Sequence, residues 1–353
     1  MADINTLIKD INKRFGVNAI RKGADINDEM NFKIPLGSVS LNDALGGGLP
    51  SGRYITLAGQ ESSGKSLLAY KAIAAVQNMY KKKITKGNFE YEVVADDGDI
   101  PLQAALIQIE SGSYSEEWGA QNGIDNDKLL FCQPEGMEQA LDIAVELQKA
   151  GVEFIVIDSI AAMLPTKYIE TDISDTAQMG IKPLKLQTYH GKFQSFNNTL
   201  ERNGKLPTTV LSINQFRDKI GGYGDPTTVP GGNSQKFTNS IEIRLRAGDY
   251  IKEGTGTNAK IVGRVIKWKI QKNKLGAAFT TGEYDLYTDD GLLPKGSIDT
   301  AKELVVLAVL KGIIERKGAW YYYNSQMLAQ GQDNLIALLR ENQDLFAEII
   351  EAL

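Results

Sequence analysis

The sequence predicts an α/β protein with a mainly parallel central sheet and a small appended α/β domain towards its C-terminal end. Between residues 54 and 213, short apolar segments typical of buried strands alternate with segments of helical periodicity. The first of these strands leads directly into a glycine-rich phosphate-binding pattern, and from residue 240 strands follow one another without helices. Parallel strands joined by helices are covered on both faces, so we expect functional side chains at the strand ends.

The composition excludes several classes of protein. A chain of 353 residues and 38.7 kDa has room for roughly two or three domains. Its longest apolar run, 304–310, is far shorter than the roughly 18–20 residues that span a bilayer, and the first residues contain no apolar signal-peptide core. The single cysteine, Cys132, cannot form an internal disulfide, which fits a reducing compartment. We therefore expect a cytoplasmic protein without membrane contact.

The charge of the chain limits how it could bind nucleic acid. A net charge of −5 and an isoelectric point near 5.3 argue against a globally basic nucleic-acid binder. Any contact with DNA must then come from a local basic surface. The only histidine, His190, argues against a histidine-based metal site or a Ser-His-Asp triad, and a structural or solvated histidine is the better interpretation.

The first predicted element is an amphipathic helix at the N-terminus. Its apolar positions recur at helical spacing and are Ile4, Leu7, Ile8, Ile11 and Phe15. A lone leading helix has no core of its own, so its apolar stripe must dock on another surface. Both its own domain and a neighbouring subunit remain open as that surface.

The core elements follow in order along the chain. We expect a strand at 54–58 and a helix at 66–80, ended by three lysines at 81–83 whose charge suits the negative end of a helix. Residues 84–102 are predicted to form a surface hairpin or loop inserted into a βαβ unit. Further strands are predicted at 105–109, 154–157, 209–213, 241–246, 261–270 and 283–287, and further helices at 137–149 and 181–200. The C-terminal residues are expected to be helix-rich and to open with a helix at 303–316.

A phosphate-binding loop is predicted directly after the first core strand. It matches the pattern G-x-x-x-x-G-K-[ST], and its members are Gly59, Gln60, Glu61, Ser62, Ser63, Gly64, Lys65 and Ser66. The two glycines let successive backbone N–H groups face phosphate oxygens, and the following helix adds its positive N-terminal end. Lys65 would reach the β- and γ-phosphates of ATP, and the Ser66 hydroxyl would coordinate Mg²⁺. The alternative is a glycine-rich turn with an incidental lysine.

Two acidic residues follow predicted strands of the same sheet. Asp158 ends the apolar strand 154–157, where a carboxylate lies in the ligand crevice of an open α/β sheet and can hold Mg²⁺ through water. A helix N-cap is compatible with the same position. Glu110 ends the strand 105–109 and can orient the water that attacks the γ-phosphate; the alternative is an ordinary exposed glutamate.

Several segments together resemble the RecA family of DNA strand-exchange recombinases. Besides the loop at 59–66, the matching segments are 129–134 (LLFCQP), 139–141 (QAL), 158–162 (DSIAA), 213–217 (INQFR), 231–233 (GGN) and 318–320 (GAW). The similarity runs from the N-terminal helix to the C-terminal helices and is far more specific than a phosphate-binding loop. It implies a RecA-type P-loop ATPase core at 37–290. An N-terminal helix and linker for subunit docking would occupy 1–36, and a small C-terminal domain would occupy 291–353.

The resemblance also implies roles for residues around the nucleotide. Glu110 matches the glutamate that activates the hydrolytic water, and Trp118 stands in the place of an aromatic residue that stacks on adenine. Gln215 matches the side chain that senses the γ-phosphate and signals to the DNA-binding loop. Lys272 and Lys274 match two lysines that reach the ATP of the neighbouring subunit.

The strand pattern bears on these two lysines. One face of the predicted strand 261–270 is apolar, and continuing its alternation places Lys272 and Lys274 on that face. A lysine there needs an anion or an escape to solvent. A neighbour's triphosphate would serve as the anion; the alternative is that the strand ends and both side chains reach water.

Two segments, 171–179 and 216–230, resemble the DNA-contacting loops of the family. The residues assigned to DNA by this resemblance are Met179, Gly180, Arg217, Lys219, Tyr223, Gly231, Gly232 and Asn233. Basic groups for phosphates together with an aromatic side chain fit single-strand binding. Lys182 and Lys185 lie near the first segment but out of register with the arginines often used there, so the resemblance assigns them no role.

These observations predict a DNA-dependent ATPase that forms filaments on single-stranded DNA, pairs it with homologous double-stranded DNA and exchanges strands. ATP and Mg²⁺ are the expected cofactors. The expected partners are both forms of DNA and further copies of the chain, with a single-strand-binding protein and a filament loader as further candidates. A hexameric helicase, a small-molecule kinase and a DNA-binding scaffold with inactive nucleotide chemistry are the alternatives.

Two departures from the family pattern concern the origin of the chain. The segment 84–102 is not typical of cellular members, and the strongly acidic C-terminal tail that many possess is missing. Both a divergent cellular member and a virus-encoded one, acting in the cytoplasm of its host, are therefore left open.

Overall fold

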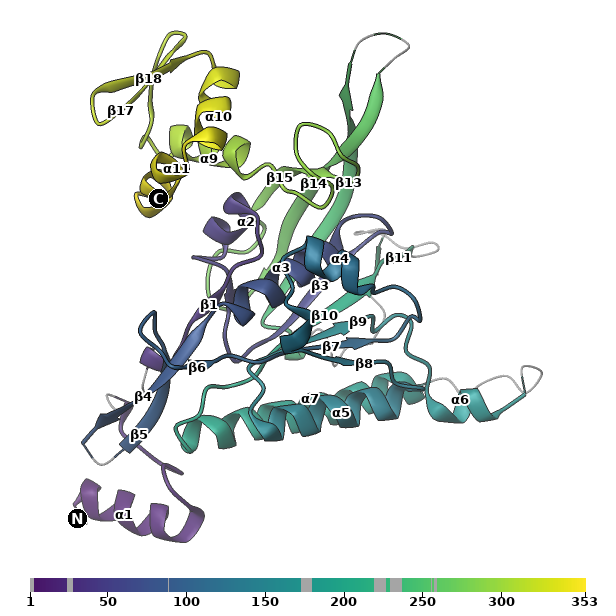
Figure 1. Cartoon of the computed structure of the whole chain (residues 1–353). Helices are drawn as coiled ribbons and strands as arrows, with labels where there is room; N and C mark the ends of the chain where they lie inside the picture. The colour runs from purple at the N-terminus through teal and green to yellow at the C-terminus, as the bar shows by residue number, and fades with distance from the viewer. Residues whose placement is uncertain are drawn as a thin grey trace.

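The computed structural model describes residues 3–23, 28–87, 89–172, 180–218, 227–228, 237–254, 256 and 259–353. Its centre is an eight-stranded sheet with the order β15-β14-β13-β3-β10-β9-β7-β8 (Figure 1). The strands are β3 (Tyr54–Gly59), β7 (Ala104–Gln108), β8 (Leu129–Cys132), β9 (Phe154–Asp158), β10 (Thr209–Gln215), β13 (Ile241–Glu253), β14 (Lys260–Asn273) and β15 (Thr281–Tyr287). No helix in the described part of the chain is long and apolar enough to cross a membrane.

The sheet has two halves that differ in strand direction. From β8 to β13 all neighbouring strands are parallel, which confirms the predicted mainly parallel sheet. Beyond β13, strands β14 and β15 pair antiparallel, and the far ends of β13 and β14 project beyond the rest of the sheet as a wing (Figure 1). We call β8 to β13 the parallel half and β13 to β15 the antiparallel wing.

Helices cover both faces of the parallel half. Helix α3 (Lys65–Gln77) lies on one face, and α5 (Met137–Ala150) and α7 (Ile181–Arg202) lie side by side on the other (Figure 1). Because successive side chains of a strand point to opposite faces, Phe154 and Val156 pack towards α3 while Ile155 and Ile157 pack towards α5 and α7. The continuous apolar runs of the sequence follow from this double coverage.

His190 on α7 lies within the second of these cores. It is 3% exposed and packs edge-to-face against Tyr54 of β3, with ring centroids 4.6 Å apart. Neither ring nitrogen has a hydrogen-bond partner among the described residues. Burial lowers the pKa of His190 to about 4, so the ring is neutral at neutral pH. Its surroundings therefore support a structural role for His190.

The segment after α3 differs from the prediction. Helix α3 ends at Gln77, and the three lysines 81–83 lie on a strand, β4 (Tyr80–Lys86), rather than at a helix end. Lys81 and Lys83 bond to carboxylates across the strand pair, Lys81 to Glu92 at 3.1 Å and Lys83 to Glu90 at 2.9 Å. These cross-strand partners, which helix periodicity ignores, account for the error.

Strand β4 belongs to a small antiparallel sheet, ordered β5-β4-β6, with β5 (Phe89–Val94) and β6 (Ile100–Pro101). This agrees with the inserted hairpin predicted at 84–102, although the insert begins earlier. The Glu92 amide donates to the carbonyl of Gly204 at 2.7 Å, which fastens β5 to the turn after α7. Gly204 has a φ of +72°, and a Cβ there would overlap the Glu90 carbonyl oxygen, so only glycine fits this approach.

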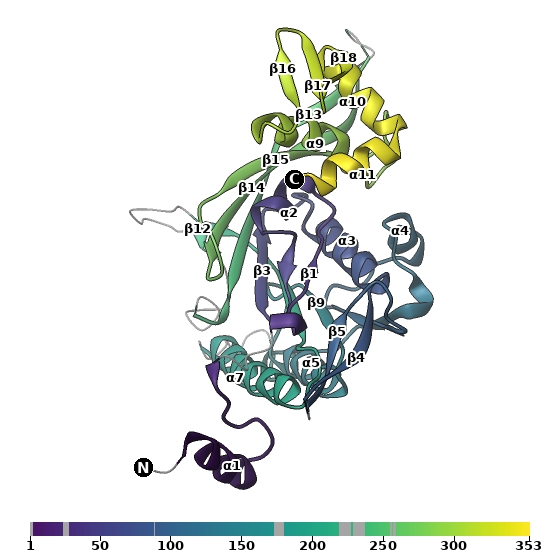
Figure 2. The same ribbon diagram turned by 90° about the vertical axis from the view of Figure 1, so that its left-hand side faces the viewer.

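The predicted N-terminal helix is present as α1 (Ile4–Phe15), and it buries none of its residues. Arg202 at the end of α7 donates to the carbonyl of Phe15 at 2.8 Å and so holds the C-terminal end of α1. The apolar stripe stays exposed, with Ile4 at 58% and Leu7 at 49%. Figure 2 shows α1 standing apart from the core, at the opposite end of the molecule from the C-terminal domain.

The C-terminal residues form a small α/β domain with its own core, as predicted. Its elements are α9 (Thr300–Leu310), β16 (Glu315–Lys317), β17 (Trp320–Tyr323), β18 (Gln326–Gln330), α10 (Gln332–Glu341) and α11 (Gln343–Glu351). The helix predicted at 303–316 ends at Leu310, because Gly312 adopts a φ of +74° and the chain then enters β16. The buried Glu303 accepts a 2.6 Å hydrogen bond from Ser38 and so joins the domain to the core.

Shorter elements complete the description. They are η2 (Asp28–Met30), β1 (Lys33–Ile34), α2 (Val39–Ala44), β2 (Leu49–Pro50), α4 (Glu116–Gln121), η3 (Asn126–Lys128), α6 (Thr166–Glu170), β11 (Arg217–Asp218) and β12 (Thr227–Thr228).

Candidate nucleotide-binding site

The phosphate-binding loop has the local geometry that the sequence predicted. Strand β3 ends at Gly59 and helix α3 begins at Lys65, with the loop between them. A Cβ on Gly59 would lie 2.5 Å from the Ser63 hydroxyl oxygen and 2.8 Å from the carbonyl oxygen of Leu245, so the loop packs against this position too closely for any side chain. Gly64 has a φ of +80°, which glycine adopts without strain. Both glycines are thus required by the fold of the loop.

Lys65 lies in the first turn of α3 and is 8% exposed. Its ammonium donates to the carbonyl of Gln60 at 2.5 Å, which holds the side chain back over the loop. Burial lowers the pKa of Lys65, while the charge of Asp158 acts in the opposite direction. A buried ammonium beside a helix N-terminus is well placed to bind an anionic phosphate.

Ser66 and Asp158 meet beside this lysine. The Ser66 hydroxyl donates to Oδ2 of Asp158 at 2.7 Å, so residues from α3 and from the end of β9 are brought together. Burial raises the pKa of the Asp158 carboxyl, and the charge of Glu110 acts in the same direction. One hydroxyl and one carboxylate are oxygen ligands of the kind that Mg²⁺ uses together with substrate phosphates, so this pair fits the ion.

Glu110 and Gln215 lie at the same edge of the sheet. Glu110 comes two residues after β7 and is exposed, and its charge acts on both Lys65 and Asp158. Gln215 ends β10 and is paired in register with Gly59 on β3. The carboxyl ends of β3, β7, β9 and β10 therefore bring both predicted side chains to the phosphate-binding loop.

Trp118 lies on α4 and is half-buried. The Lys295 ammonium lies 5.1 Å from the centre of its ring, and a Cβ on Gly296 would lie 3.1 Å from the ring edge. The ring therefore contacts the segment that follows β15. Its predicted stacking on adenine stays a prediction.

Lys272 and Lys274 lie away from this edge, on the antiparallel wing. Lys272 is opposite Glu242, which is in turn opposite Thr56 on β3. Lys272 is two strands away from β3 and level with Thr56, three residues before Gly59. These offsets put the backbones of Lys272 and Gly59 on the order of 14 Å apart. A lysine side chain does not bridge that distance to the phosphate-binding loop of its own chain.

The placement of the two lysines corrects one expectation. Lys272 is half-buried, but β14 ends at Asn273, and Lys274 is exposed and donates to the carbonyl of Phe237 at 2.8 Å. The alternation therefore does not carry Lys274 to the apolar face, because the strand ends first. Burial, followed by the charge of Lys274, lowers the pKa of Lys272.

Most of the predicted DNA contacts cannot be placed. Met179, Lys219, Tyr223, Gly231, Gly232 and Asn233 lie outside the described residues. Gly180 is the N-cap of α7, with a φ of +105°. Arg217 is described in its backbone, which pairs with Thr228 between β11 and β12.

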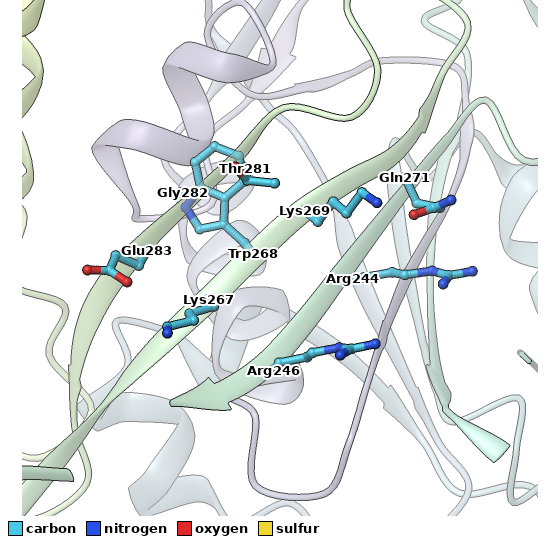
Figure 3. Close-up of a pocket in the computed structure, with 9 residues that line it drawn as sticks. All are labelled: Arg244, Arg246, Lys267, Trp268, Lys269, Gln271, Thr281, Gly282 and Glu283. Carbon is cyan, nitrogen blue, oxygen red and sulfur yellow. The ribbon is translucent and has the colours of Figure 1, made fainter. Parts of the chain in front are cut away.

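Sequence reasoning missed a basic groove on the antiparallel wing. A hollow of about 760 Å³ is lined by Arg244 and Arg246 of β13 and by Lys267 and Lys269 of β14. Figure 3 shows the two arginine side chains extending side by side from their strand, next to Lys269. The register pairs Arg244 with Lys269 and Arg246 with Lys267.

Directly opposed like charges destabilise a strand pair. Two carboxylates offset part of this repulsion: Glu242 lies 2.7 Å from Arg244, and Glu283 of β15, which also lines the hollow, is paired in register with Lys267. An anion in the groove would relieve this repulsion. The two lysines were visible in the sequence as one face of a strand. The arginines could be added only once the register of β13 against β14 was known.

A parallel sheet with a phosphate-binding loop after one strand, a magnesium-type Ser–Asp pair and a further acid at the same edge define a P-loop ATPase. Comparison with known proteins is consistent with this class. The family model described as the RecA N-terminal domain matches residues 2–86 and 82–293, and the RecA C-terminal domain matches residues 302–353.

Individual relatives agree with the family models. Protein RecA of Bacteroides thetaiotaomicron is 35% identical over 349 residues, which cover 98% of this chain and 94% of that protein. Protein RecA of Lactococcus lactis subsp. cremoris is 34% identical over 352 residues, covering 99% and 81%. Protein RecA of Staphylococcus aureus is 34% identical over 349 residues, covering 98% and 89%. The chain belongs to the RecA family of ATP-dependent recombinases.

Proposed function

We propose that this chain is a DNA-dependent ATPase that assembles on single-stranded DNA with ATP held between neighbouring subunits, and that it exchanges strands with homologous double-stranded DNA. One observation carries the proposal. The phosphate-binding loop and its acids gather at one edge of the chain, while the Lys272 backbone lies on the order of 14 Å from Gly59, too far for its side chain to reach the loop of its own chain.

In this proposal the first subunit binds the triphosphate. The amides of residues 60–64 and the Lys65 ammonium hold the phosphates, and Lys65 exchanges its bond to the Gln60 carbonyl for bonds to phosphate oxygens. Ser66 and Asp158 would hold Mg²⁺, which when bound would offset negative charge on the phosphates.

Glu110 acts as the base for hydrolysis. Its carboxylate is exposed, lies close enough to Lys65 and Asp158 to affect both pKa values, and can therefore accept a proton from water at the same edge. Gln215, opposite Gly59, can donate its amide to a phosphate oxygen without bringing charge. Residues 216–230 follow it directly, so its position is suited to link nucleotide and DNA.

A second copy of the chain completes the site. Lys272 and Lys274 of one subunit reach the triphosphate bound by its neighbour and neutralise charge that develops during hydrolysis. Helix α1, with its exposed apolar stripe, docks on that neighbour and holds the two together. Assembly and hydrolysis are coupled because neither subunit has a complete site alone.

The basic groove of the wing is the candidate surface for double-stranded DNA. Four cations on adjacent strands form the local basic surface that a chain of net charge −5 requires. Contacts of this kind are made to phosphates and carry no sequence information, which suits a protein that leaves recognition to base pairing between strands.

Electron microscopy and ATPase assays test the proposal together. With ATP and single-stranded DNA the chain should form helical filaments, and its hydrolysis should rise strongly over the rate without DNA. Closed rings under the same conditions would indicate a helicase-type motor instead. Turnover that is indifferent to DNA would favour a small-molecule kinase.

A further inference from the structure

Lys182 forms hydrogen bonds that play no part in the nucleotide site described above. It lies in the first turn of α7, two residues after the N-cap Gly180, and is half-buried. Its ammonium donates to two backbone carbonyl oxygens, that of Ala161 at 3.0 Å and that of Met163 at 2.8 Å. The side chain is thus directed into the protein and back towards the strand that carries Asp158.

A lysine at this end of a helix is electrostatically unfavourable. The N-terminus of a helix carries partial positive charge, which stabilises acids and opposes cations in the first turn. The first turn of α7 contains no acid, and Gly180 provides no side-chain cap. The bonds to the two carbonyl oxygens offset part of the cost of Lys182, since charge-assisted hydrogen bonds of this kind are strong.

The segment that Lys182 holds begins directly after Asp158. The amide of Ile160 donates to the carbonyl of Ile213 at 2.9 Å, two residues before Gln215 on β10. The carbonyl of Leu164 accepts from the amide of Met137 at the start of α5, at 2.9 Å. Residues 159–164 therefore connect the nucleotide edge to α7, with Lys182 as a polar contact on the α7 side.

The position of α7 in the chain relates this contact to the segment assigned to DNA. Helix α7 begins at Ile181, directly after the segment 171–179 that the sequence assigns to single-stranded DNA. A shift of the first turn of α7 would be transmitted through the Lys182 ammonium to the carbonyls of 161 and 163, and from there to Asp158. Coupling of two sites requires such a physical connection.

We propose that Lys182 is a positioning residue that couples DNA binding at the start of α7 to ATP hydrolysis at the nucleotide edge, and that it is not itself a DNA contact. The inference rests on the proposed function, since it presupposes DNA-stimulated hydrolysis. The nucleotide edge keeps its own hydrogen bonds, Ser66 to Asp158 and Ile160 to Ile213, when Lys182 is removed. Hydrolysis without DNA should therefore persist.

The test compares Lys182→Met with Lys182→Arg. Methionine keeps an unbranched stem and a good helix propensity but removes the donors, while arginine keeps charge and donors. Lys192→Met is the matched control, because Lys192 is exposed on the same helix, almost three turns further on. Each protein is assayed for hydrolysis without DNA, for hydrolysis with saturating single-stranded DNA, and for DNA affinity at several salt concentrations.

We expect Lys182→Met to keep its DNA-free hydrolysis and its DNA affinity within about twofold, and to lose stimulation by about 5- to 150-fold, the usual range of coupling between sites. Lys182→Arg should recover most of the stimulation, and Lys192→Met should behave like the unchanged chain. The readout that distinguishes coupling from a general structural role is this split between DNA-free and DNA-stimulated rates.

Three results would overturn the inference. Full stimulation in Lys182→Met would show that the contact carries no coupling. A weaker DNA affinity with a salt slope reduced by about one would make Lys182 a phosphate contact. An equal fall of both rates would make its role structural. If the unchanged chain shows no stimulation by DNA, the proposed function fails first and the inference falls with it.

Discussion

The parallel half and the antiparallel wing of the same sheet are built for different tasks. The parallel half is covered by helices on both faces, and its strand ends bring Lys65, Ser66, Asp158 and Glu110 together within one chain. The wing has one face that carries cations in opposed pairs, Arg244 with Lys269 and Arg246 with Lys267. The acids and the lysine of the parallel half face one another inside the chain, whereas on this face of the wing four cations lie together with Glu283 as the acid that lines the same hollow.

This difference separates two kinds of evidence for a site. A buried constellation with perturbed pKa values, such as Lys65 and Asp158, can be assigned to a function from one chain. A row of like charges can be assigned to a function only once the anion that binds to it is known. The predictions below test each half separately, and the last one tests whether they act on one nucleotide.

The largest effect is expected in the parallel half, from Lys65→Ala. Hydrolysis should be abolished, because the ammonium that binds the phosphates and stabilises their charge in the transition state is lost. Steady-state ATPase measurement checks this, with Lys71→Met, a half-buried lysine on the same helix, as the control. Hydrolysis at the unchanged rate in Lys65→Ala would remove the assignment of the phosphate-binding loop.

Glu110→Gln should give the next largest effect. We expect kcat to fall by about 10²- to 10⁴-fold while ATP and DNA remain bound, since the amide fills the same volume but accepts no proton. Filaments should persist longer than those of the unchanged chain, and microscopy after a nucleotide chase measures their lifetime. Glu117→Gln on α4 is the matched control. Loss of nucleotide binding would show that Glu110 has a structural role instead.

A smaller effect is expected in the wing, from the double change Arg246→Ala and Lys267→Ala. Affinity for double-stranded DNA should fall on the order of tenfold, and the salt dependence of binding should flatten by about two phosphate contacts. Fluorescence anisotropy at several salt concentrations measures both. The control carries Lys149→Ala on α5 and Lys192→Ala on α7, which change the net charge by the same amount. This control should bind double-stranded DNA as tightly as the unchanged chain. Equal losses in both proteins would indicate a general charge effect.

The core of the parallel half should respond to pH through His190. Its folded-state pKa, about 4, lies below the ordinary value of 6.5, so the unfolded chain binds the proton more readily. This contribution to stability is complete above pH 6.5 and is lost as the pH falls towards 4. Between pH 7 and pH 5 the loss should be roughly 2 kcal/mol. Urea unfolding of His190→Phe should show a shallower pH dependence than the unchanged chain, and parallel slopes would contradict the account.

The sequence was a good guide where a local pattern decides the structure. The apolar runs, the phosphate-binding loop and the acids after β7 and β9 could all be placed, because strand ends of a parallel sheet meet at one edge. Prediction from the sequence failed where contacts between neighbouring strands determine the structure. Lys81 and Lys83 look like a helix end until Glu92 and Glu90, their partners on the neighbouring strand, are seen.

The same limit explains what was missed at the site. Arg244 and Arg246 became part of a groove only through the register of β13 with β14, which no local pattern contains. Lys182 was noticed for its charge, but its bonds to the carbonyls of 161 and 163 depend on how α7 packs against the end of β9. Long-range contacts of this kind require the fold.

The most direct test of a site shared between subunits is a mixing experiment. One protein carries Lys65→Ala, and the other carries Lys272→Ala with Lys274→Ala; each should be inactive in DNA-stimulated hydrolysis, although the second still binds ATP. Mixed on single-stranded DNA, they can form interfaces that pair an intact phosphate-binding loop with an intact lysine pair, so part of the activity should return. No recovery at any mixing ratio, with both proteins folded and present in the same filaments, would show that the lysines act within their own chain.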